Sequence, residues 1–162
     1  MIIIGIDPGT ATTGYGVIQQ STAPGEKTPW KHVDYGCIFT SKTMAKEQRL
    51  WILEKEINKL LNTHKPDMVA IETLFFSSNI KTAMSVSEAR GVILLCVAKK
   101  KVLLKEFGPA QVKLIVTGYG RAEKKDMQDK VREVFGLKEI PKPDDAADAL
   151  CIALACASFI KS

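Results

Sequence analysis

The sequence MIIIGIDPGTATTGYGV, residues 1–17, opens the chain and predicts the centre of its fold. A β-branched run from Ile2 to Ile6 favours a buried strand. Asp7 follows, and the Pro-Gly pair behind it stops the strand, because proline cannot donate to a sheet and glycine turns freely. Residues 14–18 read as a returning strand, whose glycines leave room for something to approach the backbone. The stretch therefore predicts a hairpin that fixes an acidic side chain at the rim of a rigid sheet.

The chain length and composition predict a single globular domain over residues 1–162. No apolar run approaches the roughly 20 residues of a membrane span, so we expect no membrane partner. The N-terminus lacks the basic and small-residue features of a signal peptide, which makes a cytoplasmic location the default. A formal net charge of +5 suits a polyanionic partner. The cysteines lack CxxC spacing and lie in apolar contexts, which predicts buried free thiols: Cys37, Cys96, Cys151 and Cys156.

Hydrophobic periodicity predicts the order β-β-β-α-β-α-β-α-α-α. The predicted strands cover residues 2–7, 14–18, 33–39, 68–72 and 102–107, and the predicted helices cover residues 46–64, 82–101, 109–116, 122–135 and 144–159. An antiparallel meander followed by alternating helices and strands makes a mixed α/β sheet with helices on its faces. The helix at 82–101 is apolar on nearly every side, so it is either buried on both sides or in contact with another subunit.

Acidic residues recur where the predicted elements end or begin. Asp7 and Glu72 each end a strand, and the segment KPDDAADAL opens the last helix. In that segment, the pairs Asp145–Asp148 and Asp144–Asp148 both put two carboxylates on one helix face, and spacing alone does not choose between them. A turn explains an isolated Asp7, and N-capping explains Asp144 and Asp145. Neither interpretation accounts for Asp148, which lies in the second turn.

Carboxylates that are brought together repel one another unless cations neutralise them. Oxygen-only ligands select hard ions, chiefly Mg²⁺ or Mn²⁺, and no His or Cys is placed to make a softer site. Two such ions about 3.5–4 Å apart activate a water and stabilise the leaving oxygen of a phosphodiester. Together with the basic net charge, the acidic residues predict metal-dependent phosphodiester hydrolysis on a nucleic acid.

Five motifs, in order along the chain, resemble those of the RuvC family of bacterial crossover junction endonucleases, which resolve Holliday junctions. They are GIDPG with TGYGV, AIE with a following Phe, EARGV, G-x-AEK and DAADAL, and the resemblance runs from Ile2 to about Ala155. It implies an RNase H-like fold with a mixed five-stranded sheet flanked by helices. It also implies a function in DNA recombination and repair.

The resemblance implies four carboxylates that bind metal and carry catalysis. Asp7 and Glu72 match the family's first two metal carboxylates, and Asp145 with Asp148 matches its DxxD pair, which selects Asp145 over Asp144. Some relatives carry His at the position of Asp145. The implied cofactor is two Mg²⁺ ions per subunit, with Mn²⁺ as an alternative, and the implied products carry 5′-phosphate and 3′-hydroxyl ends.

The resemblance also implies DNA contacts. Phe75 matches an aromatic residue that stacks on an unpaired base near the junction, and its neighbour Phe76 departs from the family pattern and is a second candidate for that role. Lys113 and Lys124 match basic residues near the scissile phosphate. Without the resemblance, the two Phe residues would be interpreted as core and the two lysines as solvated helix positions.

The implied substrate is four-way junction DNA, and the implied partner is the RuvA–RuvB branch-migration complex. A C2 homodimer presents two identical sites for two matched nicks, and the apolar helix is the candidate interface. Two other functions fit parts of the sequence. GIDPGT also resembles the phosphate loop of sugar-kinase and actin-like ATPases, but the chain has room for only one of the two domains that they need. A non-catalytic junction-binding protein would not need all four carboxylates.

Overall fold

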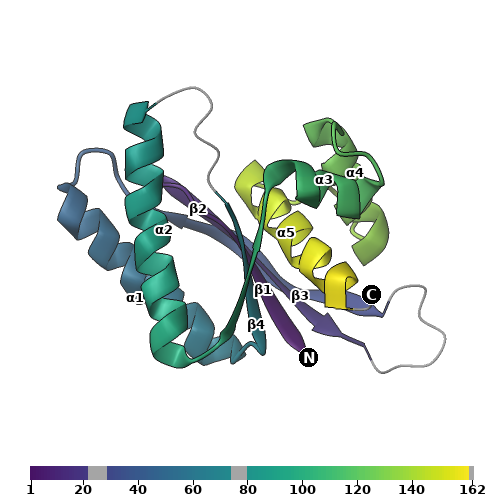
Figure 1. Cartoon of the computed structure of the whole chain (residues 1–162), viewed down its shortest axis with the longest axis horizontal. Coiled ribbons are helices and arrows are strands. Elements are labelled where there is room, and N and C mark those ends of the chain that lie inside the picture. The colour runs from purple at the N-terminus through teal and green to yellow at the C-terminus, as the bar shows by residue number, and fades with distance from the viewer. Residues whose placement is uncertain (22–28, 74–79, 161–162) are drawn as a thin grey trace.

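The computed structural model describes residues 1–21, 29–73 and 80–160, without the side chains of residues 80–82. Its elements follow the predicted order (Figure 1). They are β1 (Ile2–Asp7), β2 (Thr12–Gln20), β3 (Trp30–Phe39), α1 (Lys46–His64), β4 (Met68–Glu72), α2 (Ile80–Lys100), β5 (Leu103–Phe107), α3 (Pro109–Thr117), α4 (Lys124–Phe135) and α5 (Asp144–Ile160).

The strands form one five-stranded sheet in the order β3-β2-β1-β4-β5. β2 pairs antiparallel with both β1 and β3, whereas β4 lies parallel to β1 and to β5. The expected α/β fold, with three antiparallel strands followed by parallel strands, is therefore confirmed. Ile6 of β1 is in register with Ile71 of β4. Asp7 and Glu72, one position further along, consequently end neighbouring strands at the same edge of the sheet.

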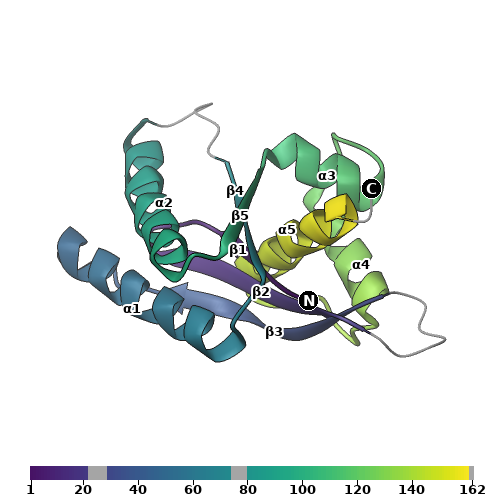
Figure 2. The same cartoon turned by 60° about the horizontal axis from the view of Figure 1, so that its bottom comes forward.

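Helices cover both faces of the sheet (Figures 1 and 2). α1 and α2 lie on one face, and α3, α4 and α5 lie on the other. Each face has its own buried apolar cluster: Ile57 and Ile93 belong to the α1–α2 side, and Phe107 and Leu150 to the α5 side. No helix in the described ranges is long and apolar enough to span a membrane.

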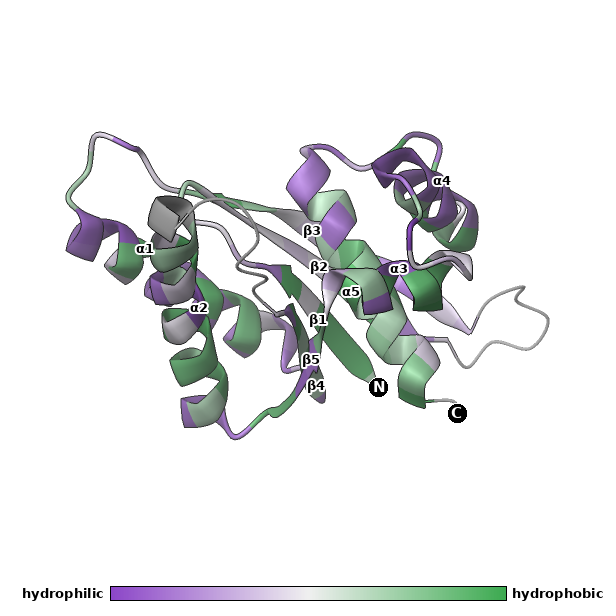
Figure 3. Ribbon diagram, turned by 45° about the horizontal axis from the view of Figure 1, so that its top comes forward, coloured by the Kyte–Doolittle hydropathy of each residue, from purple (hydrophilic) through white to green (hydrophobic). Residues whose placement is uncertain are grey.

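α5 packs directly onto β1 and β2 because glycines remove the side chains between them. A Cβ on Gly5 would lie 2.1 Å from the carbonyl oxygen of Ala149, and one on Gly14 would lie 2.0 Å from that of Asp145. The helix is buried along most of its length and mostly apolar beyond Asp148 (Figure 3). The room that the glycines of β2 were expected to leave is thus filled by α5. Because Gly14 pairs with Asp7, this packing brings the start of α5 to the acidic edge of the sheet.

The cysteines agree with the expectation of free thiols. Cys96, Cys151 and Cys156 are buried, Cys37 is half-buried, and all four are unbridged. Two helix starts differ from the prediction, and the ends of α2, α3 and α5 differ by one residue each. α2 begins at Ile80 rather than at residue 82, and α4 begins at Lys124 rather than at residue 122. The start of α4 is fixed by a capping interaction in which the backbone N–H of Glu123 donates to Asp126 Oδ2 at 2.9 Å.

α2, the helix expected to be apolar on nearly every side, has one apolar side that is buried and another that is exposed. Ala89 and Ile93 of α2 are buried against the rest of the domain. Met84 and Leu95 are 62% and 53% exposed, which leaves apolar side chains of α2 facing outward in the single chain.

Candidate active site

Three carboxylates that the sequence singled out line one cleft, whose volume is about 260 Å³. Asp7 comes from the end of β1, Glu72 from the end of β4, and Asp148 from the second turn of α5. Lys113 of α3 and Lys124, the first residue of α4, line the same cleft. Apolar side chains complete the lining, namely Pro109, Val112, Met127, Cys151 and Ile152.

Asp7 has the most strongly raised pKa of the carboxylates in the cleft. Burial raises its pKa from 3.8 to about 8, and the neighbouring charges of Glu72, Asp148 and Asp145 add to the rise. Lys124 is the cation that opposes this shift. In the protein without bound cations, Asp7 therefore retains a proton at neutral pH.

The other two carboxylates of the cleft are shifted in the same direction. Burial raises the pKa of Glu72, and the charge of Asp148 raises it further, while Lys113 lowers it. Burial also raises the pKa of Asp148, although the hydrogen bond from Lys124 works against this rise. With all three carboxylates ionised, the cleft would carry more negative charge than its two lysines balance.

Lys124 joins the cleft to the start of α5. Its Nζ lies 3.1 Å from Asp148 Oδ2 and 3.5 Å from Asp144 Oδ2. Burial lowers the pKa of Lys124, but the hydrogen bond and charge of Asp148, with those of Asp144, raise it overall. Asp144 also accepts a hydrogen bond from Lys142 Nζ at 2.7 Å, which lowers the pKa of Asp144. Spacing did not reveal that Asp144 holds Lys124, because the two residues lie on different helices.

The remaining predicted site residues lie elsewhere. Asp145 is half-buried in the first turn of α5 and does not line the cleft, although its charge contributes to the raised pKa of Asp7. Phe75 and Phe76, the predicted base-stacking residues, lie outside the described residues. The roles assigned to all these residues stay predictions.

The donor set of the cleft suits a hard divalent cation. Asp7, Glu72 and Asp148 offer only carboxylate oxygens, and their pKa values are raised first by burial and then by neighbouring carboxylates, whose charge a cation would neutralise. As the side chains stand, no three His, Cys, Asp or Glu residues in the described part of the chain are grouped closely enough to hold a metal ion. Binding would therefore need side-chain rearrangement, and Lys124 is the cation that now contacts Asp148.

Comparison with known proteins relates the chain to junction-cleaving enzymes. The family model described as crossover junction endodeoxyribonuclease RuvC matches residues 3–156. The RuvC of Fusobacterium nucleatum is 50% identical over 154 residues, which cover 95% of this chain and 78% of that protein. A Thermus thermophilus RuvC structure matches with a TM-score of 0.90 and 32% identity, covering 99% of this chain and 96% of that one. T. thermophilus RuvC in complex with a Holliday junction substrate matches with a TM-score of 0.87 and 29% identity, covering 99% and 95% of the two chains.

Proposed function

The chain belongs to the RuvC family of crossover junction endodeoxyribonucleases, and we propose that it resolves Holliday junctions by two symmetric nicks in DNA recombination and repair. The RNase H-like fold and the relation to T. thermophilus RuvC, which has been solved with a Holliday junction, support this proposal. The observation that carries it is the cleft in which Asp7, Glu72 and Asp148 face Lys113 and Lys124. Phosphodiester hydrolysis needs two components. Carboxylates hold the cations, and ammonium groups contact the phosphate.

We propose that Asp7, Glu72 and Asp148, together with Asp145, hold two Mg²⁺ ions per subunit, with Mn²⁺ as an alternative. The chemistry that such a pair supplies when bound is an activated attacking water and a stabilised leaving 3′ oxygen, which would give 5′-phosphate and 3′-hydroxyl ends. The chain's own contribution is to fix carboxylate oxygens at the ends of β1 and β4 and in the first two turns of α5. Asp145 is the ligand with the least support, because it does not line the cleft.

Lys113 and Lys124 have a second part in the proposed reaction. Both ammonium groups line the cleft that holds the carboxylates, so a phosphate drawn into it meets positive charge as well as the bound cations. Before Asp148 can bind a metal ion through Oδ2, Lys124 must move away from that oxygen. Asp144 Oδ2, 3.5 Å from the same nitrogen, offers Lys124 another acceptor near the cleft. Phe75 and Phe76 stay candidates for stacking on an unpaired base.

We propose a homodimer as the working assembly, because a near-twofold junction needs two matched sites and a C2 dimer supplies them through one interface. The outward-facing Met84 and Leu95 support α2 as that interface. The RuvA–RuvB branch-migration complex stays the expected partner, and the cytoplasm stays the expected location.

The test is incubation of the protein with a synthetic four-way junction, a linear duplex of the same sequence, and a Mg²⁺-free control. The proposal predicts paired, symmetric, Mg²⁺-dependent nicks in the junction alone. Junction binding without cutting in either Mg²⁺ or Mn²⁺ would favour a non-catalytic binder. Equal cutting of the duplex would retain the nuclease chemistry and reject the junction as the selective substrate.

A further inference from the structure

The turn that joins β1 to β2 begins directly after Asp7, and each of its last three carbonyl groups before β2 accepts a hydrogen bond from outside it. The Gly9 oxygen accepts from Thr13 Oγ1 at 2.8 Å. The Thr10 oxygen accepts from Thr40 Oγ1 at 2.6 Å and from Arg49 Nη2 at 2.5 Å. The Ala11 oxygen accepts from the backbone N–H of Thr40 at 3.0 Å. The course of the chain beyond Asp7 is therefore held from β3 and α1.

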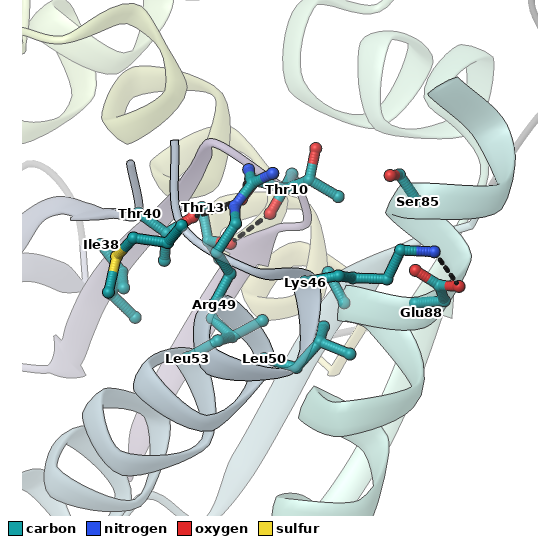
Figure 4. A pocket seen from close by; sticks show the side chains of 13 residues that line it. Thr10, Thr13, Ile38, Thr40, Lys46, Arg49, Leu50, Leu53, Ser85 and Glu88 are labelled. Carbon is teal, nitrogen blue, oxygen red and sulfur yellow. Dashed lines mark hydrogen bonds and ion pairs between the residues drawn. The ribbon is translucent and has the colours of Figure 1, made fainter. Parts of the chain in front are cut away.

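Arg49 connects these contacts. Its Nη2 donates to the Thr10 carbonyl oxygen, and its Nε donates to Thr40 Oγ1 at 3.0 Å. One planar guanidinium therefore hydrogen-bonds both to the turn and to the residue that follows β3. Figure 4 shows Arg49 directed at Thr10, whereas Lys46 of the same helix is directed at Glu88 of α2. None of the ion pairs found among the described residues includes Arg49. Its hydrogen bonds thus go to the turn and to Thr40.

Arg49 makes these contacts at a partly buried position. Thr40 is only 9% exposed, and Leu53, one turn further along α1, is buried in the core. Arg49 lies on the wall of a cavity of about 90 Å³ whose lining includes Thr10, Thr40 and Lys46. An Arg contact with two acceptors restrains direction as well as distance, which a lysine ammonium would not do.

Arg49 is linked to Asp7 through the turn and not through the cleft. Arg49 lines the cavity of about 90 Å³, whereas Asp7 lines the cleft of about 260 Å³. The contacts that lead from Arg49 towards Asp7 are those with Thr10 and Thr40, followed by the backbone of residues 8–10. A variant that keeps the positive charge but lacks the planar guanidinium therefore separates the effect of geometry from the effect of charge.

We propose that Arg49 is a positioning residue for the active site, which fixes the direction of the Asp7 carboxylate by clamping the turn behind it through Thr10 and Thr40. The inference rests on the proposed function, because it treats Asp7 as a metal ligand. Groups that orient a metal ligand from outside the coordination sphere typically account for 10–100-fold in metal affinity or activity. Arg49 is expected to act in this range although it touches neither metal nor DNA.

The test compares Arg49→Lys, which keeps the charge and loses the fork, with Thr40→Val and Thr40→Ser, which remove and keep the hydroxyl. Lys46→Gln is the matched control, because Lys46 lines the same cavity on the same helix but pairs with Glu88 at 3.0 Å and not with the turn. Mn²⁺ affinity is measured without DNA by electron paramagnetic resonance. Single-turnover junction cleavage and thermal unfolding are measured on the same samples.

Arg49→Lys and Thr40→Val are expected to weaken Mn²⁺ binding by about tenfold or more and to slow cleavage in parallel, whereas Thr40→Ser and Lys46→Gln stay within about twofold of the wild type. Wild-type Mn²⁺ affinity in the first two variants would overturn the inference. Weakened binding in Thr40→Ser equal to that in Thr40→Val would also overturn it, because the hydroxyl would then be irrelevant. If Arg49→Lys fails to fold, the two Thr40 variants decide the question. Failure of the wild type to cut junctions, in contrast, would refute the proposed function and leave the metal-binding comparison intact.

Discussion

Lys124 Nζ lies 3.1 Å from Asp148 Oδ2, so a carboxylate expected to bind a metal ion is engaged by a lysine ammonium. The same nitrogen lies 3.5 Å from Asp144 Oδ2, which does not line the cleft. A cation of the chain thus balances part of the charge that a divalent ion would balance. Metal binding and the Lys124–Asp148 contact are expected to compete.

This competition predicts opposite effects of Lys124→Gln on metal binding and on catalysis. Without the ammonium, Asp148 is free to act as a ligand, so the variant should bind Mn²⁺ about threefold to tenfold more tightly in the absence of DNA. It should nevertheless cleave junctions at least about tenfold more slowly, because positive charge near the phosphate is lost. Lys125→Gln, one residue further along α4 and exposed, is the control for net charge. Weaker Mn²⁺ binding by Lys124→Gln would contradict the competition.

The raised pKa of Asp7 predicts a pH-dependent gain in stability for Asp7→Asn. The folded, metal-free protein holds a proton on Asp7 up to about pH 8, whereas the unfolded chain loses it near the ordinary value of 3.8. Stability is therefore lost as the pH rises between these two values, and asparagine, which has no proton to lose, avoids that loss. The free energy of unfolding of the variant should exceed that of the wild type by at least about 1 kcal/mol at about pH 9 in EDTA. Urea unfolding should find a smaller difference at about pH 5, and an equal difference at both pH values would reject the assignment.

Neighbouring substitutions at the start of α5 separate the two candidate carboxylates. Asp145→Asn should weaken Mn²⁺ binding and slow cleavage by at least about tenfold if Asp145 turns toward the metal. Asp144→Asn should leave Mn²⁺ binding within about threefold, because Asp144 contacts Lys124 and Lys142 rather than the cleft. Calorimetric titration of both variants makes the comparison. The reverse order of effects would replace Asp145 by Asp144 as the ligand.

The outward face of α2 predicts where the dimer forms. Leu95→Glu should convert a dimer to a monomer at micromolar concentration, because a buried unpaired carboxylate is strongly unfavourable at an apolar interface. Trp51→Glu is the control, since Trp51 is a comparably exposed apolar residue on α1, at 61% against 53% for Leu95. Light scattering coupled to size-exclusion chromatography gives the masses. Dissociation by Trp51→Glu but not by Leu95→Glu would move the interface to another surface.

Much of the fold was predictable because its determinants are local. The run of isoleucines ending in Asp7 defined β1, and the glycines of β2 indicated a close approach, which α5 makes at Gly14. Glu72 was identifiable in the same way, as the polar residue that closes a short apolar strand. Parallel pairing of β1 and β4 then brings the two carboxylates to one edge without further information.

Features that depend on contacts between distant segments were not predictable from spacing. The register of β2 and β3 shifts between Val17 and Ile18, a bulge that the alternating pattern of residues 33–39 does not reveal. The contact of Lys124 with Asp148 and the clamp formed by Arg49 each join elements far apart in the chain. Asp145 lies outside the cleft lining, and this placement likewise depends on how α5 packs on the sheet.

To test whether Asp7 serves metal binding, we would measure single-turnover cleavage of a labelled four-way junction by the wild type and by Asp7→Asn in Mg²⁺, with junction binding measured on the same samples. Asp7 has the most strongly shifted pKa of the carboxylates in the cleft, and we assign it to metal binding rather than to DNA contact. We predict that Asp7→Asn slows cleavage by at least about a hundredfold while the dissociation constant for the junction stays within about threefold. Cleavage at the wild-type rate by Asp7→Asn would contradict the assignment of Asp7 as a catalytic metal ligand.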